Sequence, residues 1–190
     1  MASRHVARTW GIHPGGGYST VWADLAEGRL TARGRAVGLD PEPYWLTYTL
    51  ETGEAYATSR LRVTVETATT ARILDLRGHE GCWTADGVHR PDLDGALDCD
   101  LGLCPLTNTM PVLRHGLHQG APPVPHHFLM AWVSVPGLDV SPDQQTYTPL
   151  TRDGHGARVR YESGDFRSDI EFDGDGLVLD YPLLATALTR

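Results

Sequence analysis

Two aspartates, Asp98 and Asp100, have the spacing in this chain that most directly suggests chemistry. The segment from Leu97 to Leu103 alternates, which predicts a strand with one hydrophobic face and one carboxylate face. On such a strand the two aspartate Cα atoms lie about 7 Å apart. Carboxylates roughly 5 to 9 Å apart can serve glycoside hydrolysis as acid and base or nucleophile. The alternative is a structural role, in which nearby arginines neutralise both acids. The candidates are Arg72, Arg77 and Arg114.

A polar but uncharged corner, Thr107-Asn108-Thr109, follows this strand between Pro105 and Pro111. Because residues before proline avoid the α region, we expect an extended bend or turn and no helix, with a strand resuming over Val112 to Leu117. Two hydroxyls and one amide suit a neutral, hydrogen-bonding ligand such as a sugar. Alternatively, these side chains satisfy the backbone of their own turn.

Metal binding is a competing hypothesis, because several histidines and cysteines are close in sequence. They are His115, His118, His126, His127, Cys99 and Cys104. In strands, His115 and His118 point to opposite faces, so they do not converge. The Asp173-Gly-Asp-Gly segment is predicted to be a hairpin turn, since position twelve of a calcium loop would be Leu184 where glutamate is required. We therefore expect neither a metal nor a cofactor.

Composition limits the class of protein. With 190 residues, 41% hydrophobic and 21% charged, we expect one globular domain spanning residues 1–190. There is no apolar run long enough to cross a bilayer, and three cysteines are too few for a disulfide framework, so we expect a cytoplasmic protein. A net charge of -8 argues against nucleic acid as a partner. The chain contains no lysine, which excludes Schiff-base chemistry and a lysine-containing phosphate loop.

Short alternating segments dominate the chain and predict the all-β class. Tyr44 to Leu50 alternates cleanly, and Phe128 to Val135 is apolar on both faces, which predicts a strand covered on two sides. Pro182 is predicted to open one short C-terminal helix ending at Leu188. About ten or more strands separated by turns indicate a sandwich, a barrel or a strongly curved sheet.

The central motifs are also recognisable. Asp98-Cys-Asp-Leu, then Pro105-Leu-Thr-Asn-Thr-Met-Pro-Val and Arg114, resemble the signature of a bacterial family of unknown function described as putative glycolipid-binding. Further matches are Gly81-Cys82-Trp83, Leu93-Asp94-Gly95, Val135-Pro136-Gly137-Leu138, Gln145-x-Tyr147 and Asp175 to Pro182. The chain departs from the family pattern at Ala96, at Tyr56 and over Gly15 to Tyr18.

This resemblance implies a mainly antiparallel, strongly curved sheet or half-barrel, similar to lipoprotein-carrier folds, with a hydrophobic concavity for acyl chains. It brings no catalytic residues. We therefore expect non-catalytic binding of an amphipathic ligand, such as a glycolipid, in the concave face. The alternatives are a carbohydrate-active hydrolase using Asp98 and Asp100, or a protein-interaction module.

Specific residues are assigned to this binding hypothesis. The polar head contacts Thr107, Asn108, Thr109 and Arg114. Asp98 and Asp100 orient Arg114 or accept sugar hydroxyls. The apolar face takes the lipid, and its candidates are Tyr48, Trp83, Phe128 and Trp132.

Overall fold

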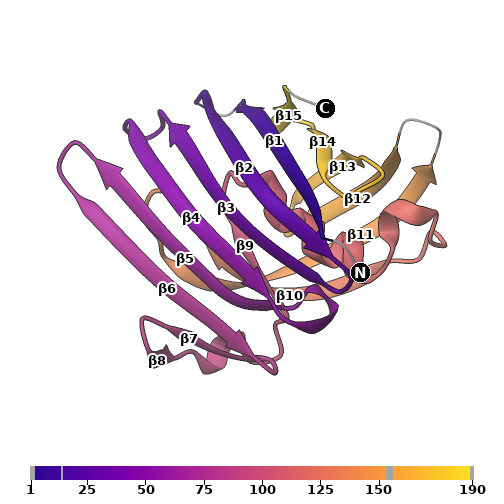
Figure 1. Ribbon diagram of the computed structural model, residues 1–190, viewed down its shortest axis with the longest axis horizontal. Coiled ribbons are helices and arrows are strands. Elements are labelled where there is room, and N and C mark those ends of the chain that lie inside the picture. Colours follow the sequence, from indigo (N-terminus) through magenta and orange to yellow (C-terminus); the bar gives the residue numbers. More distant parts are fainter. Residues whose placement is uncertain (1–2, 14, 153–155, 189–190) are drawn as a thin grey trace.

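One large sheet organises the protein. The computed structural model describes residues 3–13, 15–152 and 156–188, and within them the chain forms 15 strands in the order β8-β7-β6-β5-β4-β3-β2-β1-β15-β14-β13-β12-β11-β10-β9. The sheet is strongly curved and is not closed into a barrel (Figure 1). The strands are β1 Arg4–Ile12, β2 Gly17–Ala26, β3 Arg29–Gly38, β4 Tyr44–Thr52, β5 Thr58–Thr67, β6 Ala71–His79, β7 Cys82–Ala85, β8 Val88–His89, β9 Asp98–Leu101, β10 His126–Val133, β11 Val140–Arg152, β12 Ala157–Ser163, β13 Phe166–Phe172, β14 Val178–Tyr181 and β15 Ala185–Ala187.

The sheet is mixed because of one pair. Strands β9 and β10 run parallel, whereas the other neighbours are antiparallel. Strand β1 pairs with β2 on one side and with β15 on the other, and this contact joins the N-terminal half of the sheet to the C-terminal half. The predicted all-β class and the strongly curved, mainly antiparallel sheet are confirmed.

Alternation decides which way each strand faces. On β4, Tyr44, Leu46, Tyr48 and Leu50 are buried, and the residues between them are exposed, as the sequence pattern predicts. We call the side of the sheet that carries these buried residues the inner face, and the opposite side the outer face. The inner face carries the hydrophobic core.

A helical segment fills much of the concave side. Between β9 and β10 lie the 3-10 helices η3 (Pro105–Asn108) and η4 (Leu117–Gln119) and the helix α1 (Thr109–Arg114). This segment lies between the two halves of the curved sheet (Figure 1), and Met110 and Val112 are fully buried. Two further 3-10 helices are η1 (Glu54–Tyr56) and η2 (Pro91–Leu93).

The predicted extended corner and returning strand are wrong. Residues 109–114 form α1, although Pro111 lies inside it. Pro111 is tolerated because it occupies the first helical turn, where backbone N–H groups have no intrahelical partner. Met110 and Val112 are buried in the core, and this burial stabilises the helix. The local sequence favours an extended chain and contains no information about that tertiary contact.

The predicted C-terminal helix is also wrong. Ala185–Ala187 is the strand β15, which pairs with both β14 and β1. A terminal strand between two open strand edges satisfies backbone hydrogen bonds on both sides. One of these two partners, β1, is more than 170 residues away in the sequence, so local pattern could not predict the pairing.

Strand β9 differs from its predicted amphipathic form. Asp98, Cys99 and Leu101 are all buried, so both faces of the strand are covered. The hydroxyl Oγ1 of Thr58 on β5 accepts a 3.1 Å hydrogen bond from the Cys99 backbone N–H, and the Thr58 N–H donates to the carbonyl of Leu97. The last strand of the sheet is therefore held against β5 across the concave side.

Candidate functional site

A cavity of about 450 Å³ lies on the inner face between β9 and the strands β11 to β14. Four aromatic rings line it: Trp132, Tyr161, Phe166 and Tyr181. Its polar side chains are Asp100, Asn108, Ser141, Asp143 and Ser163. The remaining lining residues are Leu101, Gly102, Leu103, Cys104, Pro142 and Leu184. The described lining thus combines aromatic surface with carboxylates and contains no basic side chain.

Strand register brings these residues together. Trp132 on β10 is the Cα partner of Asp100 on β9 and of Ser141 on β11. On β12, Tyr161 and Ser163 lie two and four residues after the buried Val159, so all three side chains point to the inner face. Partners in register on one face lie about 5 Å apart, so residues far apart in the chain share one cavity.

A hydrogen-bonded network holds the two carboxylates of the cavity. Gln145 Nε2 donates to Asp100 Oδ2 at 2.7 Å and to Asp143 Oδ2 at 2.8 Å. Asp100 Oδ1 accepts a 2.7 Å bond from the Thr107 hydroxyl, and Asp143 Oδ1 accepts a 2.8 Å bond from the Ser163 hydroxyl. Each carboxylate oxygen therefore accepts one of these bonds and retains lone-pair capacity for a ligand hydroxyl.

The polar corner is tied to the aromatic wall. Asn108 Nδ2 donates to the Tyr147 hydroxyl at 2.8 Å, and that hydroxyl donates to Gln145 Oε1 at 3.3 Å. The ring of Tyr147 packs edge-on against Tyr161, with 5.3 Å between centroids, and Tyr161 packs similarly against Tyr181 at 5.8 Å. These contacts fix the rings before any ligand arrives.

The electrostatics of the cavity favour neutral or positively charged groups. Burial raises the pKa of Asp100, and the nearby carboxylate of Asp143 raises it further, while the hydrogen bonds from Thr107 and Gln145 act in the opposite direction. A buried carboxylate without a cationic partner is costly, and hydrogen-bond donors reduce that cost. A ligand that donates hydrogen bonds here is therefore favoured over an anion.

Two histidines of the metal hypothesis make ring contacts in the structure. Among residues 3–13, 15–152 and 156–188, no three His, Cys, Asp or Glu side chains are grouped closely enough to hold an ion. His115 and His126 do approach each other, with ring centroids 5.1 Å apart, and both pack near Phe128. Ring packing accounts for these contacts.

Comparison with known families decides the relationship of the chain. A family model described as "Putative glycolipid-binding" matches residues 7–187. The chain belongs to the putative glycolipid-binding family. None of the curated proteins compared with the chain is significantly similar to it.

Solved structures agree with this membership in the putative glycolipid-binding family. A DUF1089 family protein from Pseudomonas aeruginosa is 30% identical to the chain, with a TM-score of 0.72, and the match covers 88% of this chain and 91% of that one. A beta-barrel-like protein of the DUF1849 domain of unknown function, from Brucella abortus, is 10% identical, with a TM-score of 0.52 and coverage of 98% and 96%. The second likeness shows the fold alone.

The family motifs separate into two groups in the structure. Asp100 and Asn108 line the cavity, and Thr107 supports Asp100 from behind. Asp98 and Arg114 do not line it. They form a bidentate ion pair with distances of 2.5 and 2.7 Å.

The Asp98–Arg114 pair occupies the protein interior. The side chain of Asp98 is 1% exposed and that of Arg114 is 9% exposed. Arg114 Nε also donates to the carbonyl of Ala55 at 2.7 Å, which ties α1 to η1. Burial raises the pKa of Asp98 and Arg114 opposes that rise. Because Asp98 faces Arg114, the structure does not bring the carboxylates of Asp98 and Asp100 to a shared cavity.

Other sequence-predicted ligand residues lie in the core. Trp83 is 1% exposed and its indole N–H donates to the carbonyl of Ala96 at 2.8 Å. Tyr48 and Thr109 are likewise buried, and neither lines the inner cavity. Phe128 is half-buried against Tyr147, outside the lining. Of the four aromatic candidates, only Trp132 lines this cavity.

Several lining residues were missed from the sequence, namely Asp143, Tyr161, Ser163, Phe166 and Tyr181. The alternation of β11 and β12 places the first three on one face of the sheet, and this signal was available. It does not reveal which element stands opposite, because the segment carrying Asp100 and Asn108 reaches them only through tertiary packing.

One negative feature concerns membranes. Among the described residues, no helix has both the length and the apolar character needed to span a bilayer.

Proposed function

We propose that this protein binds an amphipathic ligand, a glycolipid, with its sugar headgroup in the inner cavity. The observation that carries the proposal is the composition of the lining: four aromatic rings beside two carboxylates and an amide, with no basic group among the described lining residues. Membership in the putative glycolipid-binding family supports it.

Sugar rings match both parts of this lining. Their C–H faces pack on aromatic rings, and Trp132 and Tyr181 offer such surfaces. Their hydroxyls donate to the spare lone pairs of Asp100 and Asp143. A buried donor–acceptor pair of this kind discriminates against ligands that lack the hydroxyl, because a polar group is then left unpaired.

The size of the cavity limits what it takes. At about 450 Å³ it falls within the usual range for small-molecule sites, roughly 300 to 1,000 Å³. Because Tyr48 and Trp83 are packed in the core, we do not assign the acyl chains to the space around these two rings. We assign them instead to the apolar part of the cavity lining, which includes Leu103, Phe166 and Leu184.

The first test is native mass spectrometry of the protein purified from its own cells, followed by denaturing extraction and lipid identification. A co-purifying glycolipid is the expected result. A clean mass without ligand under several growth conditions contradicts the proposal.

A matched pair of variants then locates the site. Asp143→Ala removes a lining carboxylate, whereas Asp169→Ala removes a half-buried carboxylate on β13 that bonds to Arg160. Binding of a short-chain glycolipid is measured by isothermal titration calorimetry. We expect an affinity loss of about tenfold or more for Asp143→Ala alone, corresponding to one charged hydrogen bond. Equal affinity of both variants, with both folded, contradicts the assignment.

A further inference from the structure

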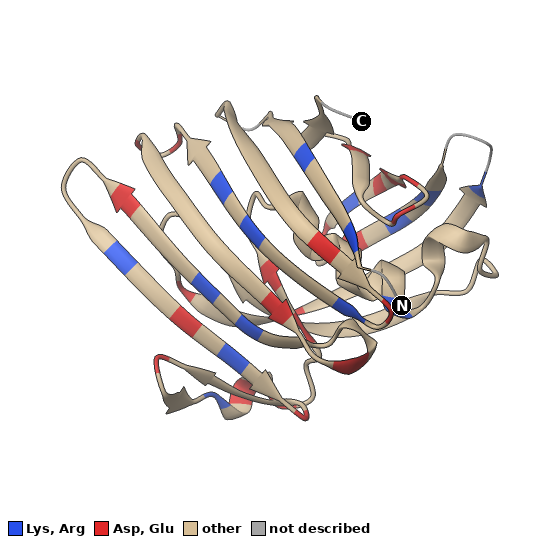
Figure 2. Cartoon of the chain, in the orientation of Figure 1, with Lys and Arg blue, Asp and Glu red and all other residues tan. Residues whose placement is uncertain are grey.

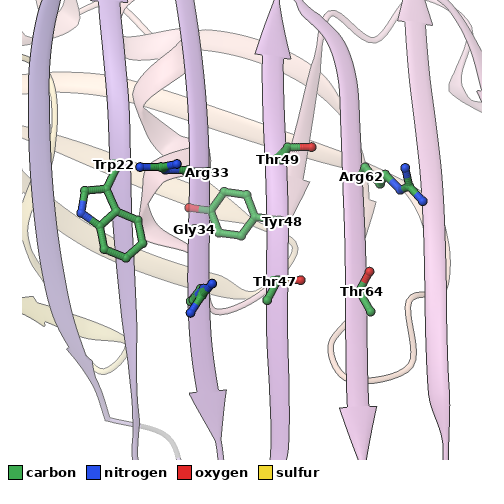
Figure 3. A pocket seen from close by; sticks show the side chains of 9 residues that line it. Trp22, Arg33, Gly34, Thr47, Tyr48, Thr49, Arg62 and Thr64 are labelled. Carbon is green, nitrogen blue, oxygen red and sulfur yellow. The ribbon is translucent and has the colours of Figure 1, made fainter.

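A second hollow lies on the outer face of the sheet, away from the inner cavity. It measures about 610 Å³ and lies over β2 to β5. Figure 3 shows its side chains, including Trp22, Arg33 and Arg62. Beneath it, the ring of Tyr48 packs against Gly34 from the inner face, so closely that a Cβ at Gly34 would lie 2.1 Å from the ring. The Tyr48 ring and the β-sheet backbone leave no passage through the sheet at this point, so this hollow is separate from the inner cavity.

Strand register arranges the outer hollow in two rows. One row runs Trp22, Arg33, Thr49 and Arg62 across β2 to β5. The next row runs Arg35, Thr47 and Thr64 across β3 to β5. Neighbouring strands lie about 4.8 Å apart and alternate residues about 7 Å apart, so three guanidiniums and three hydroxyls share a small area. We call these residues the arginine–threonine face.

Within residues 3–13, 15–152 and 156–188, no carboxylate lies within ion-pair distance of the three arginines of this face, Arg33, Arg35 and Arg62. Two neighbouring arginines differ in this respect, since Arg60 and Arg77 both bond to Asp75. Figure 2 shows the resulting basic positions along β3 and β5.

Acidic residues border the arginine–threonine face without entering its two rows on β2 to β5. Asp75 is the register partner of Arg62 on β6, but it is bound by Arg60 and Arg77. Glu51 and Glu66 lie in the adjacent rows of β4 and β5. The centre therefore carries a local positive charge in a chain whose net charge is -8.

Exposed aromatic and aliphatic side chains surround these arginines. Trp22 is 43% exposed, and the Arg33 guanidinium lies 5.7 Å from its ring centroid. Tyr18 and Trp45 lie on the same face one row further, and Ile73 is the register partner of Thr64; these three are 58 to 65% exposed. Amphipathic aromatic rings beside cations are the composition that favours the headgroup region of a bilayer.

We propose that the arginine–threonine face docks on the surface of an anionic bilayer. The three guanidiniums contact lipid phosphates, the threonine hydroxyls donate to phosphate oxygens, and Trp22 and Trp45 insert at headgroup depth. A bilayer would cover the exposed side chains of Trp45 and Ile73, whereas a small soluble anion would leave them in water. These two residues therefore favour a bilayer over a small anion. The inference does not depend on the inner cavity.

Vesicle flotation tests the proposal. Vesicles of phosphatidylcholine alone are compared with vesicles that contain about 30 mol % phosphatidylglycerol, without any glycolipid. We expect binding to the anionic vesicles only, lost when the salt rises from about 0.1 M to about 1 M. Absence of binding at low salt overturns the proposal.

Two triple variants with equal charge provide the decisive comparison. Arg33→Gln/Arg35→Gln/Arg62→Gln removes the unpaired arginines. Arg158→Gln/Arg160→Gln/Arg167→Gln removes three arginines from β12 and β13, which lie near Glu171, Asp169 and Glu162. We expect the first to weaken vesicle binding at least about tenfold and the second to leave it unchanged. Equal loss in both, with circular dichroism showing both folded, overturns the site.

Competition with soluble anions distinguishes a bilayer from the two other anionic partners, a small anion and a nucleic acid. We expect inorganic phosphate at millimolar concentration to leave vesicle binding intact. Full competition by phosphate identifies a small-anion site and overturns bilayer docking. Tighter binding of a single-stranded oligonucleotide than of anionic vesicles likewise overturns it in favour of a nucleic-acid surface.

Discussion

Asp98 and Arg114 face each other as a bidentate ion pair whose carboxylate is 1% exposed. They are 16 residues apart, and the pair fastens α1 to the end strand β9 of the sheet. The two residues belong to the motifs that carry the family resemblance, yet neither lines the inner cavity. Their position predicts a role in stability.

Removing one partner of this pair should be strongly destabilising. Arg114→Leu leaves the carboxylate of Asp98 buried without its cation, and we expect a loss of about 3–5 kcal/mol in the free energy of unfolding. Urea unfolding followed by circular dichroism measures it. Arg167→Leu is the control, because Arg167 lies 3.9 Å from Glu162 on an exposed surface. A loss below about 1 kcal/mol for Arg114→Leu would show that the pair is not structural.

Asn108 should contribute to both stability and binding. Asn108→Ala removes the donor to the Tyr147 hydroxyl, which still keeps its bond to Gln145. We therefore expect a modest stability loss of about 0.5–1.5 kcal/mol together with weaker ligand binding. Thermal unfolding and calorimetry test these effects. If Asn108→Ala changed neither stability nor affinity, the polar corner would have no part in the site.

The stability of the protein should depend on the protonation of Asp100. Its pKa is raised in the folded state, so its contribution is full below the pKa of the unfolded chain and declines as pH rises through the folded pKa. Asp100→Asn does not titrate. Unfolding free energies of both proteins measured from pH 4 to pH 7 should show the wild type losing stability relative to the variant as pH rises. A difference that stays constant over this range contradicts the raised pKa.

The three cysteines should differ sharply in reactivity. Cys82 is exposed, whereas Cys99 and Cys104 are buried. Burial raises the pKa of the Cys104 thiol to about 11 and raises that of Cys99 as well. Titration with Ellman's reagent should detect one fast thiol in the native protein and three after unfolding. In Cys82→Ser the fast reaction should disappear, and a persisting fast thiol would mean that the inner face is open near β9.

Much of the fold follows from local pattern. Alternation over Tyr44 to Leu50 places the correct side chains of β4 inward, and two-sided apolarity over Phe128 to Val135 matches β10, where the adjacent Met130 and Ala131 are both buried. Such patterns work because side chains alternate with a period of two whatever the partner strand is. Arg114 was one of three arginines expected to neutralise an aspartate, and it pairs with Asp98 from α1 and not from the predicted returning strand.

Local pattern failed where a distant partner determined the conformation. The prolines around the polar corner favoured an extended chain, but burial of Met110 and Val112 stabilises α1. The end of the chain has a plausible helix start at Pro182, but the open edges of β1 and β14 recruit it as β15.

By itself, the sequence determined the all-β class, the family motifs and the inward or outward direction of the residues of β4. Only the tertiary structure decided that Asp100 shares a cavity with Asp143 while Asp98 does not. It also decided that Arg33, Arg35 and Arg62 gather in the outer hollow, whose described lining contains no carboxylate. Periodicity is a property of neighbouring residues, whereas a site depends on which strands become neighbours, and that is settled by packing of the whole chain.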